Sequence, residues 1–328
     1  MKVGVLQFFG WRDRSVPLEQ VYQSALARID IMDKTGYDAV WLAEHHFSSY
    51  SVCPSVHVMA THIAARTQNI RIGTAVTLAP LYHPLRIAEE IALLDVLSGG
   101  RINWGAGRGF DSTEFNVFGV PPEESTERFR EAVEIVLAAW SNERLTYEGK
   151  YHQYKDVEVL PKPHQQPYPP SWVAAGSLGA IDWAAGRGFS ILMDPHSAHG
   201  QIATKLAHYH RGLKESGHPP TGRSTPIARL VALAETEAEA EVAARRGAEF
   251  SSRYIPKQAI AAIRADGKVV EPMDHYMDDV IIHGTPERVI DTLKRLEEEI
   301  PLDYLLLSPV SEKTFELFTE RVLPHVLS

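Results

Sequence analysis

The chain has 328 residues, of which 44% are hydrophobic, and a formal net charge of −9 at pH 7. This length holds one large α/β domain or two ordinary ones, and the acidic balance excludes nucleic acid or an anionic membrane as the main partner. The sole cysteine, Cys53, excludes an intramolecular disulfide. No stretch has the roughly 18 apolar residues of a membrane span, and residues 1–8 lack a signal-peptide pattern, so we expect a cytoplasmic protein.

Strand and helix patterns alternate from the beginning of the chain. Apolar runs typical of buried strands occupy residues 3–9, 37–43, 70–78 and 101–105. Amphipathic patterns with a period of 3.6 residues separate them and predict helices at residues 17–32, 56–65 and 84–97. Alternation of this kind predicts βαβ units with parallel strands and right-handed crossovers.

The second half continues the alternation after an interruption. A helix over residues 128–140 leads into an insertion around residues 142–170, which ends in a proline-rich segment that suits neither a helix interior nor a central strand. Four further strands are predicted at residues 172–175, 189–193, 227–234 and 303–307. Helices are predicted at residues 178–187, 201–215, 236–264 and 285–299, and the weakly patterned residues 265–283 are a candidate mobile lid.

Eight strands in this order predict an α/β fold, a (β/α)8 TIM barrel with insertions, as a single domain over residues 1–328. The active site of such a barrel lies where the strands end, so the residues after each strand are the candidates for chemistry. The strand at residues 37–43 is followed by Glu44, His45, His46 and Phe47. Histidine exchanges protons near neutral pH, which a general acid or base requires.

The histidines do not predict a metal site. His45 and His46 are adjacent, so on an extended strand end their rings point to opposite sides and do not share one ion. His57 and His62 are five residues apart, which does not match the spacing of ligands on one helix face. We expect both to be surface or hydrogen-bonded core histidines.

Two other predicted strand ends combine small residues with groups that bind phosphate. They are Gly105–Gly109, which includes Arg108, and Ala175–Ser177. Small residues let backbone N–H groups approach a phosphate, and a guanidinium binds it with two hydrogen bonds. The pattern therefore predicts a ligand that carries a phosphate. The alternative is that these glycines only form turns and that Arg108 pairs with Asp111 or Glu114.

Several segments together resemble the bacterial luciferase-like flavin monooxygenases. The first is Trp41-Leu42-Ala43-Glu44-His45-His46-Phe47. The others, in order, are Ile72–Val76, His83–Glu90, Leu94–Arg101, Gly107–Gly109 with Phe115–Gly119, Pro161–Pro163 and Gly284–Glu287. They extend over nearly the whole chain, and their order and spacing carry more weight than any one segment.

The resemblance implies an oxygenase that takes reduced FMN from a separate flavin reductase and uses O2 to oxygenate a small organic substrate. It implies that His45 acts in proton transfer and that a non-prolyl cis peptide between Ala75 and Val76 packs on the flavin ring. It also implies that Asn103 bonds the ring edge and that Arg108, Gly176 and Ser177 hold the phosphate. Members of the family commonly form dimers, so a homodimer is expected.

Two departures concern light emission, which is not expected here. Gly107 stands where the light-emitting members have a reactive cysteine, and Gly176 stands where they have an acidic residue. An F420-dependent oxidoreductase and a non-catalytic flavin-binding protein remain as alternatives. Aromatic residues near the predicted mouth favour an apolar substrate such as an aldehyde or ketone, although core packing explains several of them equally well. These residues are Phe8, Phe9, Trp11, Phe47, Trp104 and Phe110.

Overall fold

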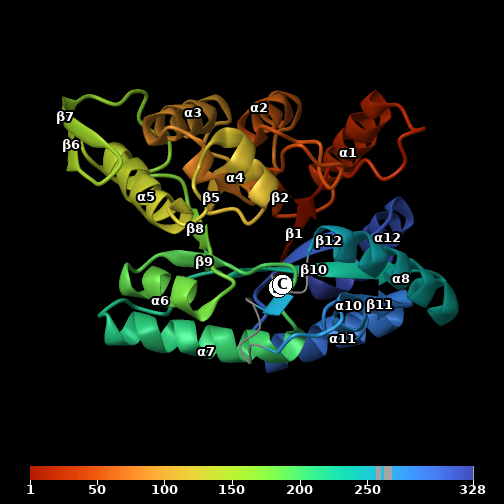
Figure 1. Ribbon diagram of the computed structural model, residues 1–328. Coiled ribbons are helices and arrows are strands. Elements are labelled where there is room, and N and C mark those ends of the chain that lie inside the picture. Colours follow the sequence, from red (N-terminus) through yellow and green to blue (C-terminus); the bar gives the residue numbers. More distant parts are fainter. Residues whose placement is uncertain (256–259, 262–267, 328) are drawn as a thin grey trace. The chain divides into compact units, whose positions relative to one another are not determined.

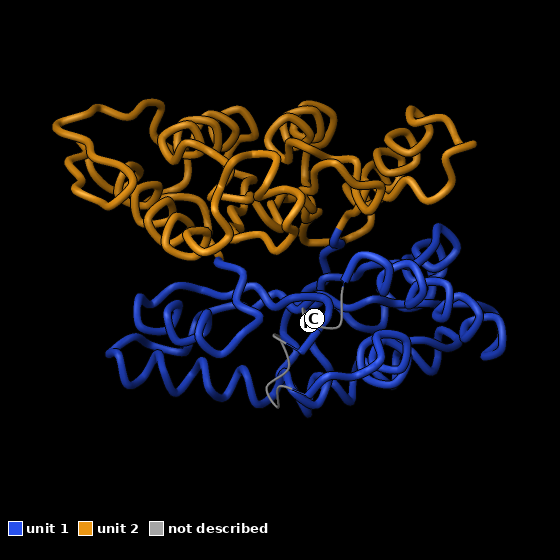
Figure 2. Tube along the Cα trace, viewed as in Figure 1, with its two compact units in different colours: residues 1–6, 173–328 blue, residues 7–172 orange. Residues whose placement is uncertain are grey.

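The computed structural model describes residues 1–255, 260–261 and 268–327 (Figure 1). The chain divides into two compact units, shown in Figure 2. The N-terminal unit comprises residues 7–172, and the C-terminal unit comprises residues 1–6 and 173–328. The prediction of one domain over the whole chain stays a prediction.

Parallel strands form the centre of the N-terminal unit. They are β2 (Ala39–Leu42), β3 (Arg71–Thr74), β4 (Thr77–Leu78) and β5 (Ile102–Gly107). β2 pairs with β3, and β5 pairs first with β3 and then with β4. The helices of this unit are α1 (Leu18–Met32), α2 (Val56–Arg66), the short η1 (Ala79–Leu81), α3 (Pro84–Leu97), α4 (Ser112–Phe118) and α5 (Ser125–Ser141). Helices α1, α2 and α3 lie side by side in that order (Figure 1).

The interior of this sheet is organised around Trp41. The indole of Trp41 fills the space that a side chain at position 73 would need, since a Cβ built on Gly73 would lie 2.4 Å from the ring. A Cβ at Gly105 would lie 2.1 Å from the carbonyl oxygen of Thr74. The hydroxyl of Thr74 also bonds both the N–H and the carbonyl of Gly105, at 2.9 and 2.7 Å. The two glycines therefore allow the large aromatic side chain and the close approach of β3 and β5.

The insertion contains an antiparallel hairpin, β6 (Leu145–Glu148) and β7 (Gln153–Val157), outside the parallel sheet. The loop between its strands is held by Glu131 on α5. The carboxylate of Glu131 accepts hydrogen bonds from the backbone N–H groups of Lys150, Tyr151 and His152. The chain then passes through cis prolines at residues 161 and 167 to β8 (Ser171–Ala174).

The C-terminal unit is also built on parallel strands. β1 (Lys2–Gln7) pairs with β12 (Tyr304–Pro309), β12 with β10 (Pro226–Leu233), and β10 with β11 (Ile282–Gly284). A parallel bridge from Met193 to Ile227 joins the end of β9 (Ser190–Leu192) to β10. Its helical elements are α6 (Leu178–Gly186), α7 (His199–Glu215), α8 (Glu237–Tyr254), α10 (Pro272–Asp279), α11 (Pro286–Glu299), α12 (Glu312–Leu317), the π-helical η2 (Phe318–Val322) and α13 (Leu323–Val326).

The eight predicted strands and their parallel direction are confirmed, except that the strand predicted over residues 70–78 is divided into β3 and β4, and β11 was not predicted. It overlaps the end of the candidate lid, residues 265–283, which also contains α10. Tyr276 of α10 packs in an apolar cluster with Ala244 and Ala248 of α8. Residues 256–259 and 262–264 of the predicted helix and residues 265–267 of the candidate lid lie outside the described residues, and mobility of the segment stays a prediction. Among the helices of the described ranges, none is both long enough and apolar enough to cross a bilayer.

Candidate functional site

His45 lies just beyond β2 in the N-terminal unit and is enclosed by aromatic rings. Its imidazole stacks on Phe8, with ring centroids 6.2 Å apart. Tyr50 and Phe110 approach it edge-on at 4.9 and 5.9 Å. These rings restrict the orientation of the imidazole and give it a largely apolar surrounding. The side chain retains 13% exposure, so His45 can meet a ligand.

Glu114 supplies a carboxylate to both histidines. Its Oε1 lies 3.4 Å from Nδ1 of His45 and accepts a hydrogen bond from the backbone N–H of His46 at 2.9 Å. Glu114 is buried in the first turn of α4, which is capped by Asp111 through a 2.7 Å bond from the N–H of Thr113. From the sequence, Glu114 and Asp111 were considered only as possible ion-pair partners of Arg108. This pairing is wrong, because Glu114 contacts His45 and His46, and Asp111 caps α4.

His46 belongs to a second set of contacts, on a different carboxylate. Its Nε2 bonds Oε1 of the buried Glu44 at 3.0 Å, and the same oxygen accepts from the hydroxyl of Tyr82 at 2.8 Å. The other oxygen of Glu44 accepts from the N–H of Leu78 at 3.3 Å. Burial, reinforced by the charge of Glu44, raises the pKa of Tyr82, which keeps its hydroxyl a donor. The two adjacent imidazoles therefore contact separate carboxylates.

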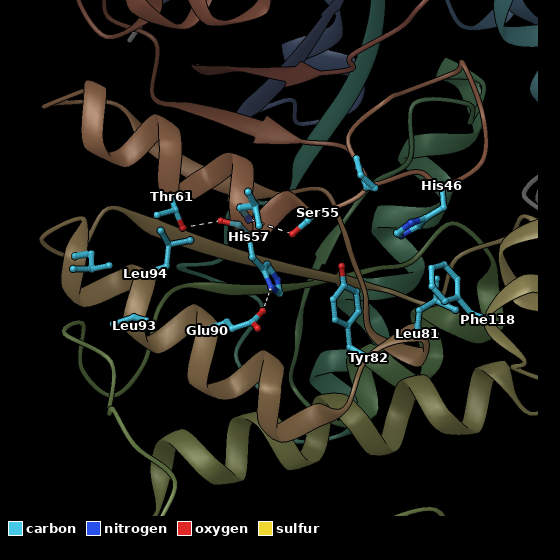
Figure 3. A pocket seen from close by; sticks show the side chains of 13 residues that line it. His46, Ser55, His57, Thr61, Leu81, Tyr82, Glu90, Leu93, Leu94 and Phe118 are labelled. Atoms are coloured by element: carbon cyan, nitrogen blue, oxygen red, sulfur yellow. Dashed lines mark hydrogen bonds and ion pairs between the residues drawn. The ribbon is translucent and has the colours of Figure 1, made fainter. Parts of the chain in front are cut away.

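His57 completes the support of β4. Its Nδ1 lies 2.8 Å from Oε2 of Glu90, and its Nε2 lies 3.1 Å from the hydroxyl of Thr77. Figure 3 shows the ring of His57 directed at Glu90. The prediction that His57 is a hydrogen-bonded core histidine is confirmed. Since Glu44 holds Leu78 and His57 holds Thr77, both residues of β4 are fixed by side chains.

A pocket of about 560 Å³ opens beside His46 and His57, between α2 and α3 (Figure 3). Its ionisable lining residues are His46, His57, Tyr82 and Glu90. Its other lining residues are Pro54, Ser55, Val58, Thr61, Leu81, Leu93, Leu94, Leu97 and Phe118. His45 does not line it, so this pocket is distinct from the surroundings of His45.

The peptide bond between Ala75 and Val76 is cis, as the resemblance implied. Both residues are half-buried. They lie between β3 and β4, and β4 pairs with the end of β5 at Ala106 and Gly107. A Cβ at Gly107 would lie 2.2 Å from Cγ2 of Val76. The absent side chain at Gly107 therefore lets Val76 pack directly on β5.

Asn103 is not brought together with His45 and Arg108. β5 extends to Gly107, so the prediction that the strand ends at residue 105 is wrong, and Asn103 is only its second residue. Its Oδ1 accepts from Nε of Arg71, at the start of β3, at 2.9 Å. The same guanidinium donates to the carbonyl of Ile102 and to Gln165. This network lies at the beginning of the strands, whereas His45 and Arg108 follow strand ends.

Arg108 is the first residue after β5, and its side chain is exposed. Its Nη1 donates to the hydroxyl of Ser125, at the start of α5, at 3.2 Å. No carboxylate in the described ranges forms an ion pair with it. A guanidinium whose charge is not balanced by a neighbouring carboxylate is suited to bind an anion.

Gly176 and Ser177 belong to the C-terminal unit. Ser177 is the N-cap of α6, where its hydroxyl accepts from the N–H of Ala180 at 3.3 Å. Free N–H groups at the first turn of a helix favour a phosphate. That these two residues share a ligand with Arg108 stays a prediction.

Comparison with known proteins identifies the family. The model of the luciferase-like monooxygenases matches residues 1–301. The chain belongs to this family. Two uncharacterised proteins of Sinorhizobium fredii are 39% and 34% identical to it, and the match covers about half of each relative, 50% and 49%. The oxygenase component of a flavin-dependent trigonelline monooxygenase from Acinetobacter baylyi is 27% identical over 85% of this chain and 81% of its own length.

Solved structures of the family confirm the predicted (β/α)8 TIM-barrel fold class. A monooxygenase from Streptomyces bottropensis is 27% identical and superimposes with a TM-score of 0.85 over 100% of both chains. The oxygenating constituent of a diketocamphane monooxygenase from Pseudomonas putida, solved with FMN, is 20% identical with a TM-score of 0.82, covering 100% of this chain and 99% of that one. An F420-dependent secondary alcohol dehydrogenase reaches 0.80 at 19% identity, covering 100% and 99%. The fold is therefore shared by FMN and F420 proteins.

Proposed function

We propose that this member of the luciferase-like family is an FMN-dependent monooxygenase that uses O2 to oxygenate a small, apolar organic substrate. The observation that carries the proposal is His45, which lies 3.4 Å from a carboxylate oxygen of Glu114 and is enclosed by Phe8, Tyr50 and Phe110 just beyond β2. A histidine in this setting is a proton-transfer group beside an apolar reactant.

The described residues fit a phosphorylated flavin. Arg108 offers a guanidinium whose bonded partner is the neutral hydroxyl of Ser125. Ala75 and Val76 offer a half-exposed apolar surface that is rigidly supported through Thr77 and Leu78. Arg108 would hold the phosphate, and Ala75 and Val76 would contact the ring. Asn103 is not assigned to the ring edge, because it is the second residue of β5 and its Oδ1 accepts from Arg71 at the start of β3.

When bound, reduced flavin supplies the electrons that O2 activation requires. The protein's part is to hold that flavin, to exclude water from the apolar surface around His45, and to move a proton at the imidazole. One oxygen atom enters the substrate and the other leaves as water. A separate reductase is the proposed source of reduced FMN, which is supported by the trigonelline relative being named an oxygenase component.

Incorporation of oxygen from O2 into the product tests the proposal. The purified chain is mixed with reduced FMN and a panel of aldehydes and ketones, and incorporation of labelled oxygen from O2 into product is followed by mass spectrometry. Substrate-dependent incorporation supports a monooxygenase. FMN binding without any incorporation across the panel would favour the non-catalytic alternative instead.

An F420-dependent oxidoreductase is kept as a second candidate because of the shared fold. An enzyme of this class would oxidise reduced F420 in the presence of its substrate without O2, or would reduce F420 while it oxidises that substrate. Anaerobic assays with F420 and with FMN side by side separate the two candidates, since a monooxygenase does not turn over without O2.

We also infer that the chain forms a homodimer through α2 and α3. Large apolar side chains are exposed on these helices, namely Val58, Leu93, Val96 and Leu97. Apolar patches of this kind on a soluble protein mark interaction sites. Sedimentation of the wild type and of Leu97→Glu tests this, and a monomeric wild type would refute it.

A further inference from the structure

We propose that Glu114 is the positioning residue for His45: it fixes the neutral imidazole with its proton on Nδ1 and leaves the lone pair of Nε2 to face the reactant. The contacts are independent of any cofactor. The consequence for catalysis rests on the proposed function, in which His45 transfers a proton.

Burial and geometry point to the Nδ1–H form. Glu114 is 2% exposed, so its carboxylate has lost water and requires protein donors. One donor is the N–H of His46, at 2.9 Å from Oε1. Nδ1 of His45 lies 3.4 Å from the same oxygen. A proton on Nδ1 makes this contact attractive, whereas a lone pair there would face the negative charge. Because a neutral imidazole carries a single N–H proton, a proton on Nδ1 leaves Nε2 as the proton acceptor.

The neighbouring histidine is held in the opposite way. His46 bonds the buried carboxylate of Glu44 through Nε2, at 3.0 Å. Glu44 therefore favours the Nε2–H form of His46, while Glu114 favours the Nδ1–H form of His45. The ring atom of His46 that would resemble Nε2 of His45 is already occupied. The two adjacent imidazoles are therefore not interchangeable, since the lone pair lies on Nε2 at His45 and on Nδ1 at His46.

The aromatic enclosure keeps the imidazole from turning away from Glu114. Phe8 stacks on it with an angle of 13° between the rings, and Tyr50 and Phe110 meet it edge-on. A carboxylate at one ring nitrogen and rings at the faces and edge leave little rotational freedom. Orientation of this type is what a carboxylate partner contributes to a histidine.

Nitrogen NMR of the protein labelled on its histidine side chains tests the proposal without cofactor or turnover. Spectra are recorded above the pH at which the imidazoles are charged, and His45→Asn identifies the His45 signals. In the wild type we expect His45 as Nδ1–H and His46 as Nε2–H. Glu114→Ala should lower the ratio of Nδ1–H to Nε2–H at His45 by about tenfold or more, and Glu114→Gln should lower it less, since a neutral oxygen is the weaker acceptor.

Glu44→Gln is the matched control, because it makes the same chemical change beside the other histidine. It should change the signals of His46 and leave those of His45 in place. An unchanged His45 tautomer in Glu114→Gln and Glu114→Ala would overturn the proposal. If Glu114→Ala does not fold, the isosteric Glu114→Gln decides, since an unaltered ratio there would also refute it.

Kinetics supply a second readout. With reduced FMN and O2, Glu114→Gln should lower kcat by about 10–100-fold with little change in the flavin affinity. A purely structural carboxylate would instead lower thermal stability and leave the tautomer ratio alone. Failure of the proposed function would appear as absent turnover in the wild type, while the NMR result would still decide the role of Glu114.

Discussion

Replacing Gly107 by alanine tests how closely Val76 packs on β5. The new Cβ would lie 2.2 Å from Cγ2 of Val76, 3.1 Å from its Cβ and 3.5 Å from its Cγ1. Carbon atoms in contact are normally about 3.5–4.0 Å apart, so the methyl group of Val76 must move. Val76 is β-branched and has one strongly preferred rotamer in most settings, so the movement requires a less favourable rotamer or a shift of the backbone.

The expected cost follows from two opposing effects. Overpacking of this kind costs about 1–3 kcal/mol. Gly107 is not among the described glycines with positive φ, so alanine restricts the unfolded chain and returns about 0.4–1 kcal/mol. Overpacking is the larger effect, and Gly107→Ala should lower the free energy of unfolding by about 1–2 kcal/mol.

Val76→Ala is the matched partner in a double-mutant cycle. It removes both methyl groups and leaves only the 3.1 Å approach of the Cβ atoms, which is tight but tolerable. In this background Gly107→Ala should cost little, giving a coupling energy of about 1–2 kcal/mol. Urea unfolding measured by tryptophan fluorescence supplies the four free energies. FMN affinity of the same proteins is a second readout, because the proposed ring contact includes Val76.

Strictly additive costs would refute the reasoning, since they would show that the alanine is not opposed by Val76. A stable Gly107→Ala with unaltered FMN affinity would contradict it as well.

Three further predictions concern single residues. Arg108→Ala should weaken FMN by about 10–100-fold and riboflavin hardly at all, because a charge-assisted bond to phosphate is lost; equal losses measured by fluorescence titration would speak against a phosphate contact. His45→Ala should keep flavin affinity and lower turnover by about 10²–10⁴-fold, with exposed His62→Ala as the control, and a fully active variant would contradict the role. Arg229→Met should stabilise the protein by roughly 1–3 kcal/mol, because the fully buried guanidinium has no hydrogen-bond partner among the described residues. Burial lowers the pKa of Arg229 to about 10, so the penalty is present below that pH and is relieved above it; marked destabilisation in urea at pH 7 would refute this account.

Local patterns were sufficient for most of the secondary structure. Helices α2, α3 and α11 begin where proline or a capping residue precedes an apolar period, and all eight predicted strands are present. Hydrophobic periodicity and end signals are properties of neighbouring residues, so they can be read without a structure. β11 was missed because three residues in a weakly patterned segment carry too little of that signal.

The sequence predicted that the rings of His45 and His46 point to opposite sides, because the residues are adjacent on an expected strand end. β2 ends at Leu42, before either residue, and this stays a prediction. The hydrogen-bond partners of the two histidines could not be predicted from the sequence. Glu114 accepts from the backbone N–H of His46 across 68 positions of sequence, and α4, which carries Glu114, was not among the predicted helices. The fourth predicted strand was ended at residue 105 because the extension of β5 to Gly107 depends on β4, a neighbour in space that supplies the last ladder pairs.

Backbone periodicity and the order of elements are thus encoded locally, and they determined the barrel class and the strand end that bears His45. Three features depend on the packing of distant segments. They are the carboxylate that each imidazole contacts, the need for a residue without a side chain at Gly107, and the extension of β5 to residue 107. The physical reason is that hydrogen-bond partners and steric limits are set by separation in space, which sequence spacing does not specify.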